Sequence, residues 1–217
     1  MATRGTSSRT RLSPEQRRDQ LLTLGAQLFA TQPYEDVHIE RVAEMAEVSR
    51  GLLYHYFPNK RAFFAALLDR AASHLAEATA PDPALTPREQ LYGGIESYLD
   101  HCRANREGMR AIHRGAASAD PDVEAIIERS TSLHEQRVLD VLEPDGRPHA
   151  LLTIAVRSWI PLLRAAAHAW LEAAEATPPA PRDEVRDLCA GALVGALVAL
   201  PAAARPARLD DLLSSSD

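Results

Sequence analysis

A series of helix start and stop signals constrains the fold of this chain more than any other feature. Residues 13–16 (SPEQ) and 86–89 (TPRE) each pair a hydroxyl N-cap with proline at the first helical position and Gln or Glu at the third. This combination predicts a helix start. Pro33, Pro58 and Pro144 predict helix ends, because the residue before a proline is pushed out of the helical conformation.

The segments between these signals carry apolar residues at helical spacing, and no segment reads as a convincing strand. The sequence therefore predicts an all-α protein with about nine helices. Residues 80–87 hold three prolines and mark a domain boundary. We expect a flexible basic arm over residues 1–12, a first domain over 13–79, a second over 85–204 and a tail over 205–217. The expected helices run from Pro14 to before Pro33, over Ile39–Ala46, from Ser49 to before Pro58, from Asn59 to Thr79, from Pro87 to Asn105, near 107–116, from Pro121 to before Pro144, from Pro148 to Ala176 and from Pro181 to Leu200.

Composition favours a cytoplasmic protein with closely packed helices. Apolar residues make up 46% of the 217 and aromatic residues only 5%, and alanine is abundant. Cys102 and Cys189 lie far apart and fit no metal spacing, so reduced buried thiols are favoured over a disulfide. The first ten residues lack the apolar region of a secretory signal. The longest charge-free run, 188–204, is shorter than the roughly 20 residues of a membrane span and reads as a buried interface helix.

The overall net charge of −6 hides an asymmetry along the chain. Residues 1–70 carry ten Lys and Arg against eight Asp and Glu, whereas residues 71–217 carry 14 against 22. A weakly basic end on an acidic body is compatible with phosphate contact at that end only.

Residues 48–60, VSRGLLYHYFPNK, concentrate aromatic side chains in a chain otherwise poor in them. On a helical wheel Leu53 and Phe57 fall together, one turn apart, and are expected to be buried. The opposite side presents an aromatic and hydrogen-bonding face. The alternative is that all these rings pack internally, but the wheel leaves no second buried face for Tyr54, His55 and Tyr56.

Two short helices joined by a tight turn, the second with such a face, predict a helix-turn-helix. Its second helix fits the DNA major groove. Arg50 can present a bidentate fork to guanine, and Leu52 can contact a thymine methyl. Gly51 allows close backbone approach. Tyr hydroxyls, His55 and Lys60 suit phosphate oxygens.

This motif, preceded by IERVAEMAE, resembles the DNA-binding domain of tetracycline-repressor-like (TetR) transcription regulators. The resemblance covers about residues 14–70 and implies an all-α protein in two parts. It places seven residues at DNA-contacting positions, and we add His38 as an eighth candidate. Arg50 and Leu52 would read bases, whereas Tyr56 and Lys60 would hold phosphates. The candidate DNA contacts are Arg50, Gly51, Leu52, Tyr54, His55, Tyr56, Lys60 and His38.

Three positions depart from the family pattern. Glu47 stands where Gly is common in the turn, which predicts a strained backbone conformation costing about 1 kcal/mol. Leu52 replaces the usual Thr and favours methyl contact. Val37 and His38 stand where Ser or Thr usually caps the second helix, so Asp36 is the expected substitute cap.

In the second domain, the last helix carries a stripe of small residues at helical spacing. Small residues let helix backbones approach closely, so we expect a homodimer interface here rather than an intramolecular core contact. The resemblance adds that this family dimerises through its last two helices as a four-helix bundle. The expected interface residues are Gly191, Ala192, Gly195, Ala196 and Ala199.

A cavity in the same domain would be mainly aliphatic, with few rings and some histidines. For each histidine the alternative is a solvated or structurally bonded side chain, and for the tryptophans it is a place in the core. Pro161 is expected to kink the 148–176 helix. The candidate ligand-binding residues are Tyr98, His101, His113, His134, Trp159, His168 and Trp170.

No nucleophile elbow, metal-binding motif, phosphate loop or dinucleotide fingerprint is present, so we expect neither an enzyme nor a cofactor. The sequence predicts a dimeric repressor that a small-molecule effector of unidentified structure releases from double-stranded operator DNA. Two alternatives stay open: a constitutive or protein-controlled DNA-binding factor, and a helical binding or enzyme domain whose head has lost DNA binding.

Overall fold

A computed structural model describes residues 12–113, 120–173 and 180–214. These residues form helices and no strand, which confirms the predicted all-α class. The described elements, in chain order, are α1 (Pro14–Thr31), the 3-10 turn η1 (Tyr34–Asp36), α2 (Glu40–Met45), α3 (Arg50–Tyr56), α4 (Lys60–Ala78), α5 (Pro87–Ala104), α6 (Arg106–His113), α7 (Pro121–Leu142), α8 (Ala150–Ala173), α9 (Arg182–Val198), η2 (Ala202–Ala204) and α10 (Leu209–Leu213).

The predicted helix starts are confirmed by their caps. Ser13 Oγ accepts a hydrogen bond from Gln16 N at 3.2 Å, and Gln16 Oε1 accepts one from Ser13 N at 2.9 Å. Thr86 and Glu89 form the same reciprocal box at the start of α5. Asn59 caps α4 by accepting from Ala62 N at 2.9 Å. These bonds satisfy backbone donors that a helix start otherwise leaves free.

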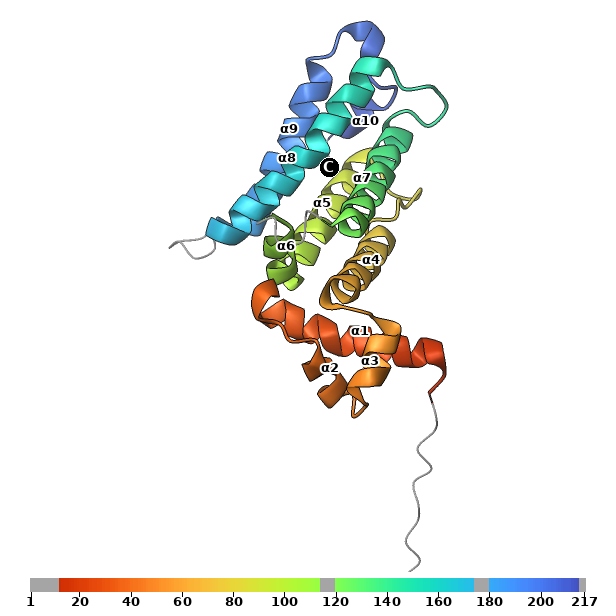
Figure 1. Cartoon of the computed structure of the whole chain (residues 1–217). Coiled ribbons are helices and arrows are strands. Elements are labelled where there is room, and N and C mark those ends of the chain that lie inside the picture. The colour runs from red at the N-terminus through yellow and green to blue at the C-terminus, as the bar shows by residue number, and fades with distance from the viewer. Residues whose placement is uncertain (1–11, 114–119, 174–179, 215–217) are drawn as a thin grey trace, which may run out of the picture.

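The helices divide into a head, α1–α4, and a body, α5–α10. In Figure 1 α1, α2 and α3 form one end, and α4 runs from α3 up to the body, where it lies beside α7. The apolar core of the head also takes in Ala111 of α6 and Val123 and Ile126 of α7. The head is therefore packed directly onto the base of the body, and a shift of α6 or α7 must disturb its core.

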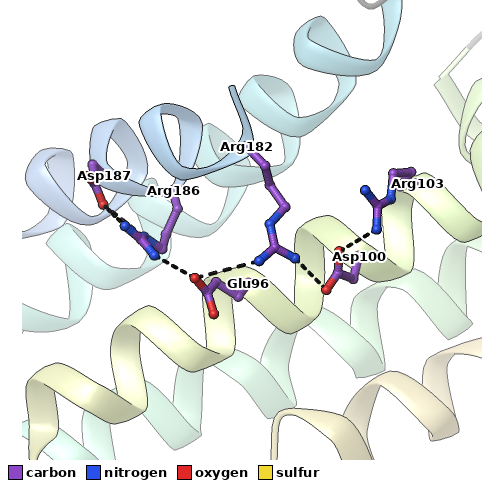
Figure 2. Close-up of polar contacts among 6 residues, drawn as sticks. All are labelled: Glu96, Asp100, Arg103, Arg182, Arg186 and Asp187. Carbon is purple, nitrogen blue, oxygen red and sulfur yellow. Dashed lines mark hydrogen bonds and ion pairs between the residues drawn. The ribbon is translucent and has the colours of Figure 1, made fainter. Parts of the chain in front are cut away.

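An ion-pair network fastens α9 to α5 (Figure 2). Arg182 contacts Asp100 at 2.6 Å, and Arg186 contacts Glu96 at 2.5 Å. A network of several charges contributes more to holding two helices together than an isolated surface ion pair does. The network therefore fixes α9 relative to α5.

The long helix α8 passes through the body against α9, α7 and α5. It continues across Pro161 from Ala150 to Ala173. By length and composition alone it could cross a membrane. In the folded chain it buries one face, and the Trp159 indole nitrogen donates to the carbonyl of Cys189 on α9 at 2.8 Å. That face is part of the body's core.

The chain beyond residue 204 differs from the expected tail. Residues 209–213 form α10, and its Leu209 and Leu212 are buried in the body's core. The Arg208 amide also donates to the carbonyl of Leu142 at 3.2 Å. Five residues are too few to show helical periodicity, and tertiary burial stabilises this helix. Of the expected basic arm, residues 1–11 lie outside the described residues.

Candidate functional site

The predicted two faces of α3 are confirmed. Leu53 and Phe57 are 0% and 2% exposed, and the Phe57 ring meets the Phe63 ring of α4 edge-on at 4.6 Å. Ser49 caps the helix by accepting from Leu52 N at 3.2 Å. The anchor and the cap together fix which side of α3 faces outward.

The turn before α3 adopts the strained conformation that its sequence predicts. Glu47 has φ of 53°, a left-handed value that L-residues other than Gly rarely adopt. The Val48 amide donates to the Ala43 carbonyl at 2.9 Å, and the Glu47 amide donates to the Glu44 carbonyl at 3.1 Å. These two bonds define a Schellman motif, which normally places Gly where Glu47 stands.

The start of α2 departs from expectation. Asp36 was expected to cap α2, but it belongs to η1, and α2 begins at Glu40 without a side-chain cap. Val37 and Ile39 are buried in the head core, and this burial sets the path of the chain into α2. His38, between them, is exposed.

The outward face of α3 contains the remaining predicted DNA contacts. Arg50, Gly51, Tyr54 and His55 are exposed, whereas Leu52 and Tyr56 are half-buried. The Tyr54 hydroxyl donates to the Glu40 carboxylate. This bond raises the pKa of Tyr54 and lowers the pKa of Glu40. A carboxylate thus lies at the edge of this face.

Lys60 has a more confined position than the sequence indicates. Its ammonium donates to the Glu35 carbonyl at 3.0 Å and lies 4.7 Å from the centre of the Tyr34 ring. Partial burial lowers its pKa. In this conformation Lys60 ties the start of α4 to η1, beside the exposed Asn59.

The body holds a cavity of about 350 Å³, within the size range of small-molecule sites. Four of the predicted ligand-binding residues line it: Tyr98, His101, His134 and Trp159. The cavity lies where α4, α5, α7 and α8 meet, and apolar side chains form most of its wall. Of the described His, Cys, Asp and Glu side chains, no group of three or more could hold a metal ion.

Two other predicted ligand-binding residues, His168 and Trp170, do not line this cavity. His168 lies 3.6 Å from Glu172, and the Trp170 indole nitrogen donates to the Ala180 carbonyl at 3.0 Å. The last residue of α8 at the cavity is Arg164. His168 is one turn further along the helix, about 6 Å away at 1.5 Å per residue. The side chain of His113 lies outside the described residues.

Part of the cavity wall also holds the end of α4. His134 of α7 lies 2.9 Å from the hydroxyl of Thr79, the C-cap residue of α4. Arg137 donates to the Ala76 carbonyl at 2.6 Å and to Thr79 Oγ1 at 3.2 Å. Thr79, His134 and Arg137 all line the cavity. Sequence reasoning missed Thr79 and Arg137, because they meet only when α4 packs on α7.

Burial changes the chemistry of two groups beside Arg164. It raises the pKa of the Tyr98 hydroxyl well above its usual value, with Cys102 and Arg164 nearby. It also raises the pKa of the Cys102 thiol to about 11. Both groups are therefore neutral near pH 7, and the Tyr98 hydroxyl is hydrogen-bonded with the Cys102 thiol and with Arg164.

Both α8 and α9 carry exposed apolar side chains outside the core. Leu188 on α9 is 66% exposed, and Ile154 on α8 is 57% exposed. Of the predicted interface residues, Gly191, Gly195, Ala196 and Ala199 are exposed, and Ala192 packs partly against the core. A Cβ added at Gly191 or Gly195 would meet no atom within 4 Å. Nothing within the described chain covers this part of α9.

A helix-turn-helix head joined to a helical body is the architecture of helix-turn-helix transcription regulators. The family described as "Bacterial regulatory proteins, tetR family" matches residues 21–67, and "Tetracyclin repressor-like, C-terminal domain" matches residues 87–195. The chain belongs to the TetR family. The second match extends the evidence for this family beyond the head, to which the sequence resemblance was limited.

Similar proteins are regulators as well. The transcriptional activator FasR of Mycolicibacterium smegmatis is 27% identical over 67% of this chain and 68% of FasR. The regulator EthR of Mycobacterium tuberculosis is 32% identical over 46% of this chain and 50% of EthR. A crystal structure of a TetR-family regulator from Streptomyces coelicolor superposes with a TM-score of 0.77 and 28% identity, covering 86% of this chain and 82% of that one.

Proposed function

We propose that this protein is a cytoplasmic, dimeric repressor that a small-molecule effector releases from operator DNA. One observation carries the proposal: the cavity wall includes Thr79, His134 and Arg137, which together hold the end of α4. The other end of α4 begins at Lys60, four residues after α3 ends. A molecule in the cavity can therefore act on α3 through a single helix.

The DNA-binding part of the proposal rests on the exposed face of α3. Arg50 stands at the first position of the helix, where side chains reach base edges in the major groove. Leu52 and Gly51 suit a thymine methyl and a close approach of the backbone. Tyr56 and Lys60 are the proposed phosphate contacts, and Lys60 would have to leave the Glu35 carbonyl or reach past it.

The dimer part rests on the exposed apolar side chains of α8 and α9. A two-fold dimer presents two recognition helices to two half-sites about one DNA turn apart. Exposed glycines on α9 would let the partner's backbone approach closely. The same contact would cover Leu188 and Ile154, which are otherwise open to solvent.

The proposed switch is a population shift. An effector that changes the contacts of Arg137 or His134 favours conformers in which α4 has moved. Both α4 helices of the dimer then reposition their α3 helices, and the half-site spacing is lost. The effector can shift the equilibrium between the two conformers by no more than the difference in its binding free energy to them.

Site selection from random duplex DNA, followed by titration of the selected site, tests the DNA interface. We expect Arg50→Ala to weaken binding by about 1–3 kcal/mol and to relax preference at one base. We expect Lys60→Ala to weaken binding and to lower the salt slope by about one. Arg103→Ala is the control, because it removes the same charge from an exposed side chain on α5, outside the head. Unchanged affinity in both head variants would refute the assignment.

A reporter gene under the selected site tests the direction of regulation. The similar protein FasR is named an activator, so activation is the alternative to test. A fall in transcription when this chain is absent would contradict the proposed repression. A body that binds no small molecule would instead favour a constitutive or protein-controlled factor. The absence of any salt-sensitive DNA affinity would favour a binding or enzyme domain without DNA function.

A further inference from the structure

The two arginines that line the cavity differ in how well they are paired. Arg137 is engaged by the Ala76 carbonyl and by Thr79. Arg164 contacts the hydroxyl of Thr131, 3.5 Å from its Nη1, and the hydroxyl of Tyr98. None of the ion pairs in the described parts of the chain includes Arg164. Arg157, two turns earlier on α8, is exposed and pairs with Glu135 at 3.2 Å.

An under-paired guanidinium beside an apolar cavity is an unusual arrangement. Arg164 is half-buried. Taking a charge away from water is costly unless an opposite charge or hydrogen-bond acceptors compensate. A guanidinium presents five donors in a planar fork that matches a carboxylate. Two neutral hydroxyls offer fewer acceptors than the guanidinium has donors and no opposite charge, so Arg164 favours a ligand that brings an anionic group.

The surroundings of Arg164 fit an anionic group as well. The neutral Tyr98 hydroxyl beside it brings no negative charge that would pair with the guanidinium. Two carboxylates border the cavity, Asp82 and Glu89, and both are exposed. Asp82 accepts from Ala84 N at 2.9 Å, and Glu89 accepts from Thr86 N at 2.8 Å. Both are engaged in local turns and caps rather than with Arg164.

The rest of the wall suits an apolar body of limited size. Leu75, Ile95, Met109, Ile126 and Ile160 line the cavity from five different helices. A volume of about 350 Å³ corresponds to roughly a dozen heavy atoms at about 30 Å³ each. Burying an apolar chain of this length supplies affinity, and the charged end supplies orientation.

We propose that the effector is a carboxylic acid of about a dozen heavy atoms, with its carboxylate at Arg164 and its apolar body among the aliphatic side chains. The inference rests on the proposed function, in which this cavity is the effector site. It adds the chemical class of the effector and the residue that recognises it. Linear and ring-bearing acids share this chemistry.

Calorimetry with matched probes tests the class of the ligand. Decanoate, decanol and decylamine share a chain and differ in the charge of the head group. We expect the wild-type protein to bind decanoate at least about tenfold more tightly than decanol, because hydrogen bonds to charged groups are the stronger kind. Decylamine should bind most weakly. Phenylbutyrate against decanoate distinguishes ring-bearing from linear acids.

Arg164→Gln is the decisive variant, and Arg157→Gln is its control on the same helix. The preference for decanoate over decanol should fall below about threefold in Arg164→Gln and stay unchanged in Arg157→Gln. Decanol affinity should be the same in all three proteins, which also verifies that the variant cavity is folded. Equal binding of decanoate and decanol to the wild type would overturn the proposal, as would an equal loss of preference in both variants.

Release of operator DNA by the same probes separates this inference from the proposed function. If decanol or decylamine releases the DNA and decanoate does not, the acid class is wrong and the switch stands. If decanoate binds with the expected Arg164 dependence but leaves DNA affinity unchanged, the acid site stands and the switch is wrong. Binding of decanoate together with release of DNA supports both.

Discussion

Gly25, in the middle of α1, is the position where the smallest change should have the largest effect on the head. Gly25 is buried, and an added Cβ would overlap Cε1 and Cζ of Phe63. The overlap exceeds about 1 Å when compared with the roughly 3.5–4.0 Å that separates unstrained carbon atoms. Phe63 is 0% exposed and stands between the rings of Phe29 and Phe57, so its ring has no free space to enter.

The net effect of Gly25→Ala follows from two opposing terms. Overpacking a core costs typically about 1–3 kcal/mol, and an overlap with a confined ring belongs at the upper end. Replacing Gly by Ala inside a helix gains about 1 kcal/mol. We therefore expect a net loss of about 2 kcal/mol. Gly94→Ala in α5 is the matched control, because its Cβ would meet no atom within 4 Å and only the helix gain remains.

Urea denaturation of the full-length chain measures both changes. The two substitutions are chemically identical and lie within helices of 18 residues each, so opposite signs can arise only from the surroundings. Combining Gly25→Ala with Phe63→Leu should recover part of the loss, as a non-additive interaction between neighbours. If Gly25→Ala stabilises the protein as much as Gly94→Ala does, the packing explanation is wrong.

Three further predictions concern the interface, the turn and pH. Gly195→Arg should leave the monomer folded and shift the protein from dimers to monomers in analytical ultracentrifugation. Ser132→Arg, on an exposed part of α7, is the control and should leave the dimer intact. A dimer that persists in Gly195→Arg would refute the α9 interface. Glu47→Gly should raise the free energy of unfolding by about 0.5–1 kcal/mol, because relief of left-handed strain outweighs the greater entropy of the unfolded chain. Glu47→Ala keeps the strain and should show no such gain. Burial lowers the pKa of His101 and His134 below 6.5, so the unfolded chain takes up protons more readily. Their stabilising contribution is complete above about pH 6.5 and is lost as the pH falls below it; substituting both by Gln should flatten that part of the urea-midpoint profile.

Local signals account for what could be predicted of the fold. Each cap at Ser13, Asn59 and Thr86 involves residues within one helical turn, so its hydrogen bonds depend on few distant atoms. The two faces of α3 follow from helical periodicity together with one buried pair. The positive φ of Glu47 was expected from the family resemblance, because Gly is common at this position of the turn. These features needed no knowledge of the tertiary structure.

The helix α10 and the start of α2 could not be predicted in the same way. The helix α10 has five residues and lacks a side-chain cap, and it is held by burial of Leu209 and Leu212. Likewise, Asp36 is a good cap by residue type, but burial of Val37 and Ile39 decides where α2 begins. Tertiary packing overrides weak local preference in both places.

The cavity shows the same division between local and tertiary information. Residue type and the expected domain were enough to identify Tyr98, His101, His134 and Trp159 as candidates. Which histidines and tryptophans reach the cavity depends on where α8 leaves it, one turn before His168. The sequence by itself determined most of the helices, the capped starts of α1, α4 and α5 and the outward face of α3, because those depend on neighbours within a turn or two. Only the tertiary structure decided that residues 79, 137 and 164 share one cavity, because that depends on where helices distant in sequence cross.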